Sequence, residues 1–317
     1  MKNIKYIFAI VVVLFAMTIS FGASAASIIY SGECGADGDN LTWALDSDYN
    51  LVISGSGDMK DYSSSDNRWR GNAAQIKSVS ISEGVTSIGN YAFRNCSSLS
   101  EISIPEGLKT IGGYAFSSCS NLSSISLPDS LTTIKSSAFH GCSSFSSISI
   151  PSNVTSIGQY AFHSCSGIKS ISIPNGVTLI SNYSFANCSN LTSISIPDSV
   201  TVIDYCAFNA CKKLKSITIP ADITSIGSSA FYRCTDLTDV YFNGAVLPTI
   251  SDDAFSGCTP TIHCLKNSDI ETWAKGKGYT VKPHTITIDS GSCGADGDNV
   301  TWTLDSDGVL TICIFKV

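Results

Sequence analysis

The sequence predicts an α/β repeat protein: a right-handed solenoid with a parallel β-sheet on one face, short helical turns on the other face and small β-rich end modules. Three residue types recur with one period, because phenylalanines, cysteines and prolines each reappear after 23 residues. Self-similarity at a fixed period of about 20–50 residues is the signature of a repeat architecture. The recurring positions are Phe93, Phe116, Phe139, Phe162, Phe185, Phe208, Phe231 and Phe255; Cys96, Cys119, Cys142, Cys165, Cys188, Cys211, Cys234 and Cys258; and Pro105, Pro128, Pro151, Pro174, Pro197 and Pro220, with a slip of one residue before Phe255 and Cys258.

One repeat contains a short strand, a turn and a compact apolar segment. Leu99, Ile102 and Ile104 alternate with polar residues, as in a half-buried strand. Pro105 ends that strand, because proline cannot donate a hydrogen bond to a ladder. Apolar residues within 114–119 recur at near-helical spacing and predict about one helical turn. Counting the phenylalanines gives eight coils.

Stacking must supply the core, because a single coil cannot bury its apolar edge alone. Equal repeat length puts identical residues above one another, so the inward isoleucines should form a ladder. We expect this ladder at Ile102, Ile125, Ile148, Ile171, Ile194 and Ile217.

The repeat unit LSEISIPEGLKTIGGYAFSSCSN resembles the 23-residue leucine-rich repeat of BspA-like surface proteins, over residues 76–260. The segment Cys34–Met59 is similar to the β-rich module that often precedes such repeats, and IHCLKNSDIETWAKGKGYT resembles their terminal cap, with Thr272–Lys275 on a short helix. The expected organisation is a leader at 1–25, a β-rich cap module at 26–75, the solenoid at 76–260, a C-terminal cap at 261–284 and a second copy of the β-rich module at 285–317.

The N-terminus has the pattern of a secretory leader. Lys2 and Lys5 precede an apolar run over 6–17, and Ala23-Ser24-Ala25 offers a small-residue cleavage site. The apolar run is shorter than the ~20 residues that span a bilayer, which disfavours a membrane anchor. We expect cleavage after Ala25 and a secreted or cell-surface protein.

The entry module returns near the C-terminus as CGADGDNVTWTLDSDGVLTI, from Cys293 to Ile312. The first copy continues from Ser54 to Met59 with SGSGDM, whereas the second continues differently and stops at Val317. We interpret this difference as truncation or a frame change in a gene whose full product is longer.

The cysteines are expected to be buried thiols. Neighbouring coils place them within disulfide distance, but side chains that point the same way keep their Cβ atoms farther apart than a relaxed disulfide needs. A linear ladder also lacks the clustered spacing of a zinc site. Cys258 and Cys264 are the one pair that could form a bridge, and Cys206 occupies the slot that Tyr114 and Tyr160 fill elsewhere.

Composition and motifs argue against nucleic-acid binding and catalysis. Only 14% of the residues are charged and the net charge is −7, which leaves no basic excess for phosphates. His140 and His163 share one repeat position and could form a metal pair, but no carboxylate accompanies them; the other histidines are His263 and His284. No phosphate-binding or dinucleotide motif is present. We therefore expect a non-enzymatic protein without cofactor or metal.

The end modules contain acidic pairs that could suit calcium. They do not fit the EF-hand pattern, and Asp-Ser-Asp-Gly after Leu304 is more typical of a hairpin turn. Trp43 and Trp302 are expected in the cores of their modules. The acidic residues are Asp37, Asp39, Asp46 and Asp48, with Asp296, Asp298, Asp305 and Asp307 in the copy.

The outward sheet positions are mostly serines, which lack the aromatic and arginine anchors that dominate binding energy. Larger and charged side chains appear only in the late coils, so we place a protein-binding surface there, although solvated variation beside a cap explains them equally well. The candidate residues are Lys212, Lys213, Lys215, Tyr232, Arg233, Asp236, Asp239 and Tyr241.

The resemblance implies adhesion between a microbe and its host, with extracellular proteins such as fibronectin and fibrinogen among the partners reported for relatives. We expect a monomeric protein that binds such proteins or glycoproteins. Two alternatives remain: a structural spacer of the cell envelope, and a glycan- or ice-binding array built on regularly spaced hydroxyls.

Overall fold

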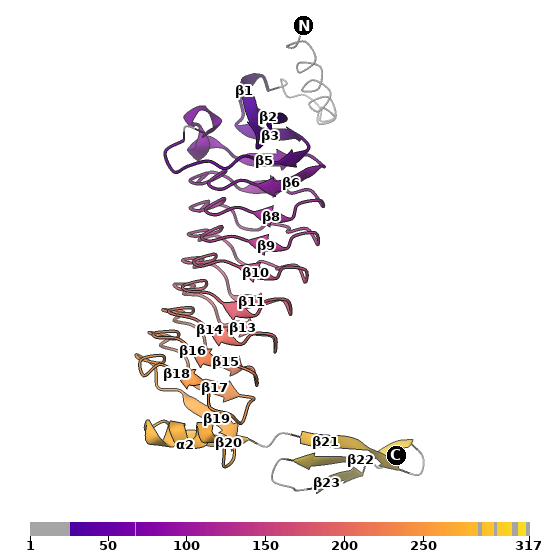
Figure 1. Cartoon of the computed structure of the whole chain (residues 1–317), viewed down its shortest axis with the longest axis vertical. Helices are drawn as coiled ribbons and strands as arrows, with labels where there is room; N and C mark the ends of the chain where they lie inside the picture. The colour runs from indigo at the N-terminus through magenta and orange to yellow at the C-terminus, as the bar shows by residue number, and fades with distance from the viewer. Residues whose placement is uncertain (1–25, 67, 285–286, 295–296, 306–309, 315–317) are drawn as a thin grey trace. The chain divides into compact units, whose positions relative to one another are not determined.

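The repeats form stacked turns of a parallel β-solenoid. The computed structural model describes residues 26–66, 68–284, 287–294, 297–305 and 310–314, and the chain divides into two units, the first ending at Val154 and the second beginning at Thr155. Within each unit, successive turns lie one on the next (Figure 1). The units together contain about nine turns with little helix, which confirms the predicted fold class.

The first unit begins with an antiparallel module that continues into the parallel sheet. Strand β1 (Ile28–Gly35) pairs antiparallel with β2 (Gly38–Asp46), and β2 pairs antiparallel with β3 (Asn50–Gly55). Strand β3 then pairs in parallel with β5 (Ser78–Ile81), and β5 with β7 (Glu101–Ser103). The module thus supplies the strand on which the first coil is built.

A second parallel sheet runs along the same unit with very short strands. Its strands pair side by side in the order β4, β6, β8 and β9, and two 3-10 helices, η1 and η2, precede the first coil. These elements are β4 (Gly57–Asp58), β6 (Val85–Ile88), β8 (Thr110–Ile111), β9 (Thr133–Ile134), η1 (Arg68–Gly71) and η2 (Ala73–Gln75).

The second unit repeats this arrangement. One face has β11 paired with β13, and β15, β17, β19 and β20 paired in that order; the other has β12, β14, β16 and β18. The strands are β10 (Ser156–Ile157), β11 (Ser170–Ser172), β12 (Leu179–Ile180), β13 (Ser193–Ser195), β14 (Val202–Ile203), β15 (Ser216–Ile219), β16 (Ser225–Ile226), β17 (Asp239–Phe242), β18 (Thr249–Ile250), β19 (Thr261–Leu265) and β20 (Val281–His284).

A short helix, α2 (Asp269–Gly276), lies in the cap between β19 and β20. Its N-terminus is a reciprocal capping arrangement: the Ser268 hydroxyl accepts from the Glu271 N–H at 3.2 Å, and the Glu271 carboxylate accepts from the Asn267 N–H at 2.6 Å.

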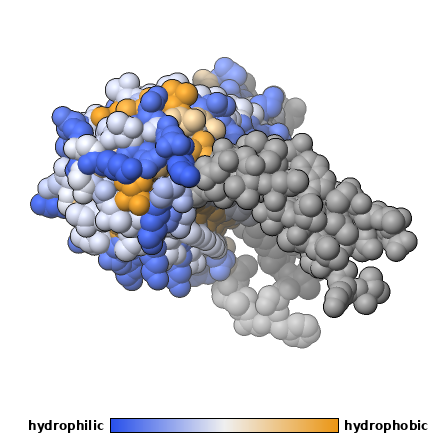
Figure 2. All heavy atoms as spheres, turned by 90° about the horizontal axis from the view of Figure 1, so that it is seen from below, coloured by the Kyte–Doolittle hydropathy of each residue, from blue (hydrophilic) through white to orange (hydrophobic). Residues whose placement is uncertain are grey.

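Seen from below, small hydrophobic areas of the molecule lie between hydrophilic side chains (Figure 2).

The strands of the second module pair in the same way as those of the first. Strand β21 (Thr287–Gly294) pairs antiparallel with β22 (Gly297–Asp305), and β22 with β23 (Leu310–Ile314). Gly291 stands opposite Trp302, as Gly32 stands opposite Trp43 in the first copy. The proposed leader, most of the Asp305–Gly308 turn and the last three residues lie outside the described residues.

Stacked aromatic rings form the centre of the core in each unit. Phe93 stacks on Phe116 with ring centroids 5.3 Å apart, and Phe162 on Phe185 at 5.5 Å. The aromatic column of the first unit begins one coil before the first repeated phenylalanine, because Trp69 stacks on Phe93 with ring centroids 5.7 Å apart. Trp69 thus extends the aromatic column beyond the phenylalanines that were counted as eight coils.

One step of the predicted isoleucine ladder is present in the strand register, and the sheet is not continuous. Ile171 stands opposite Ile194 in the parallel register, with the expected 23-residue step. Ile125 and Ile148 are also buried, but residues 124–126 and 147–149 are not assigned to strands. Apolar burial is thus retained in these coils without a regular hydrogen-bonded strand.

The segments expected to be short helical turns have a different hydrogen-bond pattern. Residues 92, 94 and 96 donate their N–H to the carbonyl three residues earlier, whereas residues 91, 93 and 95 donate to the next coil. Tyr91 and Asn95 have positive φ, which turns alternate N–H groups outward along the stack. An α-helix satisfies its own N–H groups internally, so it could not link neighbouring coils in this way.

The ladder cysteines are buried thiols, as predicted, except Cys258, which is half-buried. The Sγ atom of Cys119 donates to the carbonyl of Phe93 at 3.1 Å, and Cys188 to that of Phe162 at 3.2 Å. Burial raises the pKa of Cys188 to about 12. Cys258 and Cys264 are both free thiols, so the pair that could have formed a bridge does not.

Candidate protein-binding surface

Four outward residues form one row across the sheet of the second unit. Strands β15, β17, β19 and β20 are parallel, and their register aligns Thr218, Tyr241, His263 and Lys282. Strand residues alternate between faces, and the neighbours Val240 and Ile262 are buried, so this row faces outward.

Asp239, Tyr241 and His263 form a connected cluster on this face. His263 Nε2 lies 2.7 Å from Asp239 Oδ1, and the Tyr241 ring stacks on the His263 ring with centroids 4.2 Å apart. The Thr238 hydroxyl donates to the other Asp239 oxygen at 2.8 Å. These hydrogen bonds hold the pKa of Asp239 below its usual value, and the bond with His263 has the larger effect. The cluster is a pre-organised site with a carboxylate, an imidazole and an aromatic ring.

The predicted lysines lie at the corner that leads into β15. Lys212, Lys213 and Lys215 are all exposed. Backbone bonds join this corner to the next coil, because the Asp236 N–H donates to the Lys212 carbonyl at 3.0 Å and the Thr238 N–H to the Lys215 carbonyl at 2.9 Å. The structure therefore brings the lysines and Asp236 to neighbouring positions beside the sheet face.

Tyr232 and Arg233 lie elsewhere on the coil. They belong to the turn segment before Cys234, where the Arg233 guanidinium stands 4.9 Å from the Tyr232 ring centroid. Asp239 and Tyr241, in contrast, face outward from β17. The eight predicted residues thus divide between a sheet-and-corner group and a turn-segment pair.

Sequence reasoning missed His263 and Lys282 as members of this surface. Tyr241 pairs with His263, a step of 22 residues, so the 23-residue period does not align them. The available signal was the outward position of His263 in the alternating segment Thr261–Leu265.

The other candidate histidines, His140 and His163, belong to earlier repeats of the chain. His163 contacts Ser164 and Asn187 through its ring nitrogens, at 3.0 and 3.2 Å. Burial lowers the pKa of His140 below its usual value. In the described part of the chain, no three His, Cys, Asp or Glu side chains gather closely enough to hold a metal ion.

Asp46 of the first module stabilises a turn. Its Oδ1 atom accepts hydrogen bonds from the backbone N–H groups of Asp48 and Asn50, at 2.9 and 2.8 Å. Trp43 is 7% exposed and packs edge-on against Trp69 with centroids 5.3 Å apart, so it is a core residue of the junction with the first coil.

The sequence matches the family model described as the BspA type leucine rich repeat region, in six copies over residues 70–191 and 155–274. The chain belongs to this family. Its repeats are therefore BspA-type leucine-rich repeats, as the resemblance of the repeat unit to this family indicated. A search of curated proteins finds no match.

Solved structures of bacterial leucine-rich repeat proteins are similar to this chain. One from Bacteroides ovatus ATCC 8483 is 27% identical, with a TM-score of 0.54 over 78% of this chain and 76% of the other. One from Eubacterium ventriosum ATCC 27560 is 22% identical, with a TM-score of 0.45 over 80% and 85%. One from T. pallidum is 26% identical, with a TM-score of 0.43 over 57% and 90%.

None of the helices in the described part of the chain has both the length and the apolar character needed to cross a bilayer.

Proposed function

We propose that this BspA-type leucine-rich repeat protein is a non-enzymatic, extracellular binding protein that attaches to proteins of a host. Repeat families of this kind present extended surfaces for partners. The leader pattern of the first 25 residues supports an extracellular location.

The observation that carries the proposal is the cluster of Asp239, Tyr241 and His263. Serines occupy the outward positions of most earlier strands, whereas here an aromatic ring is held in place by a stacked imidazole, which is itself bonded to a carboxylate. A rigid tyrosine loses little conformational entropy on binding, and tyrosine is enriched among residues that dominate interface energies. The cluster is therefore the anchor of the proposed interface.

The lysine corner gives the interface its electrostatic character. Lys212, Lys213 and Lys215 are exposed beside the cluster and would attract acidic segments of a partner. Such charges act mainly on the rate of association and are screened by salt. Fibronectin and fibrinogen, which the family resemblance implies, are the first partners to test.

The experiment measures binding of the protein from residue 26 to 317 to immobilised fibronectin and fibrinogen by surface plasmon resonance. We expect saturable binding, and Tyr241→Ala should weaken it by about tenfold or more, as loss of an interface anchor does. Replacing the three lysines with serine should slow association at low salt. The matched control is Ser170→Ala with Ser172→Ala, on an exposed part of the same face.

Equal binding by the native protein and Tyr241→Ala would exclude the cluster as the anchor. No binding to either partner by a correctly folded protein would contradict these partners, and a protein that binds no extracellular protein at all would favour the spacer. If the protein bound glycans in a screen but bound no protein, the glycan-binding array of regularly spaced hydroxyls would be favoured.

A further inference from the structure

Neighbouring coils are joined by a ladder of backbone hydrogen bonds in their turn segments. Within each unit, the N–H of the core phenylalanine and the N–H two residues later donate to carbonyls of the next coil. In the last complete step, Phe231 donates to Ala254 at 2.8 Å and Arg233 donates to Ser256 at 3.0 Å. These bonds point along the stack toward the cap.

The ladder stops at the last coil with two donors left over. Phe255 and Gly257 occupy the positions of Phe231 and Arg233, but their N–H groups have no hydrogen-bond acceptor among the described residues. Tyr279 stands where the next phenylalanine would be, 24 residues after Phe255. It meets Phe255 edge-on at 6.3 Å, whereas Phe231 and Phe255 stack at 5.1 Å. The cap thus replaces the next coil without completing its hydrogen bonds.

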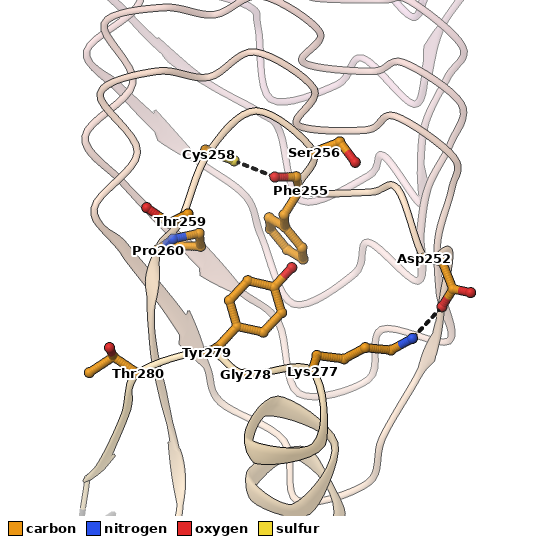
Figure 3. A pocket seen from close by; sticks show the side chains of 10 residues that line it. All are labelled: Asp252, Phe255, Ser256, Cys258, Thr259, Pro260, Lys277, Gly278, Tyr279 and Thr280. Atoms are coloured by element: carbon orange, nitrogen blue, oxygen red, sulfur yellow. Dashed lines mark hydrogen bonds and ion pairs between the residues drawn. The ribbon is translucent and has the colours of Figure 1, made fainter.

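A pocket of about 380 Å³ occupies this interrupted step, between the last coil and the segment after α2. Figure 3 shows the Tyr279 ring pointing toward the Phe255 ring, and Lys277 extending to Asp252. Cys258 and Pro260 contribute to the wall on the coil side. The pocket therefore combines aromatic surface with polar groups.

The polar groups around the pocket include hydrogen-bond donors. Phe255, whose N–H has no acceptor among the described residues, lines the pocket, and Lys277 brings an ammonium group. Gly257 lies between the lining residues Ser256 and Cys258. The Phe255 carbonyl already accepts the Cys258 thiol at 3.0 Å. Asp253 is turned to the preceding coil, where its carboxylate accepts from the hydroxyls of Ser228 and Ser229, at 2.9 and 2.8 Å.

Among the lining residues, Asp252 supplies a carboxylate, and this carboxylate is exposed. Lys277 Nζ pairs with Asp252 Oδ1 at 2.6 Å, and the Asp252 side chain is 87% exposed. An exposed ion pair of this kind contributes little stability. An incoming anion could therefore take the place of Asp252 on the Lys277 ammonium.

We propose that this pocket binds the C-terminal carboxylate of a peptide. Backbone N–H groups that lack partners bind carboxylates, and the C-termini of polypeptides are recognised in this way. The carboxylate would accept from the Lys277 ammonium and the Phe255 N–H, a backbone carbonyl of the peptide would accept from the Gly257 N–H, and the terminal side chain would lie against the Tyr279 ring. The site lies at the end of the coil stack, apart from the Tyr241 cluster, so this inference stands or falls independently of the proposed function.

A peptide is favoured over an acidic sugar by the chemistry of the ladder itself. In every preceding step of each unit, the same pair of N–H groups donates to two backbone carbonyls that are two residues apart, as Phe208 and Ala210 do with Ala230 and Tyr232 at 2.8 and 2.7 Å. A peptide offers backbone carbonyls of this kind together with a C-terminal carboxylate that matches the charge of Lys277, whereas an acidic sugar offers the carboxylate without the backbone carbonyls.

The test uses the protein from residue 26 to 317, labelled with nitrogen-15 in phenylalanine and glycine, and titrated with acetyl-trialanine, its C-terminal amide and N-acetylneuraminic acid. We expect saturable binding of the free acid, with amide-proton shifts at Phe255 and Gly257, and at least about tenfold weaker binding of the amide, because charged acceptors form stronger hydrogen bonds. Equal binding of acid and amide, tighter binding of the sugar, or no shift at these amides would overturn the proposal.

Three variants separate the pocket from nonspecific charge effects. Lys277→Met should weaken binding of the free acid several-fold, whereas Asp252→Asn should strengthen it, because the competing carboxylate is removed. Lys275→Met is the matched control, since Lys275 pairs with Glu271 on α2 and does not line the pocket. Equal effects of Lys277→Met and Lys275→Met would count against the site.

Discussion

The indole of Trp69 stacks on the ring of Phe93, with centroids 5.7 Å apart and planes 12° from parallel. The Trp69 Nε1 atom donates to the Ala92 carbonyl at 2.8 Å, which fixes the ring at the end of the phenylalanine column. Trp69 is 2% exposed, so the first unit uses it to close its core on the side of the entry module.

Truncation of this ring should destabilise the first unit as strongly as truncation of a core phenylalanine. We expect Trp69→Ala to lower the free energy of unfolding by about 3–5 kcal/mol, because it leaves a cavity in a packed stack. Phe162→Ala, in the second unit, should cost about the same. Denaturant titration of both variants measures this, and an unchanged midpoint for either would refute the role of that ring.

The alternating turn segments need residues that tolerate positive φ. Gly141 has φ 73°, and a Cβ atom there would meet only ordinary contacts, the nearest being Ser118 Oγ at 3.7 Å. We expect Gly141→Ala to cost about 1–2 kcal/mol through backbone strain alone. Gly107→Ala is the control, because Gly107 is not among the residues with positive φ and a Cβ there would meet only Val85 O at 3.9 Å. Equal stability of the two variants in thermal unfolding would exclude strain as the cause.

The buried thiols predict a loss of stability at alkaline pH. Burial raises the pKa of Cys188 from 9.0 to about 12, so above pH 9 the unfolded protein releases this proton while the folded protein keeps it. Unfolding then becomes easier by about 1.4 kcal/mol per pH unit for each such thiol, until the folded thiol also ionises. The difference in unfolding free energy between the native protein and Cys188→Ala should shrink accordingly between pH 9 and 12. A difference that stays constant would contradict the raised pKa.

Asp46 should act through its hydrogen bonds and not through a metal ion. Its carboxylate accepts three bonds, two from the N–H groups of Asp48 and Asn50 and one from the Asn50 side chain. We expect Asp46→Ala to lower the free energy of unfolding by about 1–3 kcal/mol. Addition of calcium or of a chelator should leave the melting temperature of the native protein unchanged, and a rise with calcium would show that the module binds it.

Sequence reasoning succeeds where one residue repeats in register. Cys188 and Phe162 lie at fixed positions of a 23-residue period, and equal spacing makes their neighbours in the next coil the same residue types. The period therefore predicts the stacked column, the buried thiols and the buried isoleucines without any knowledge of the cap.

Sequence reasoning fails where residues depart from the 23-residue period. Trp69 is missed because it is not a phenylalanine and precedes Phe93 by 24 residues. Tyr241 and His263 meet through a 22-residue step. In both cases the contact depends on how an irregular segment packs on the last or first coil.

The sequence by itself determined that this protein is a stack of coils with a phenylalanine and cysteine core, because identical residues at identical spacing can bury their apolar edges only against one another. The tertiary structure alone decided what lies at the end of that stack. The register of β19 places His263 against both Asp239 and Tyr241, and the cap leaves the N–H groups of Phe255 and Gly257 without acceptors among the described residues, beside a pocket that Phe255 lines. Both results depend on long-range packing of non-repeating segments, for which the period carries no information.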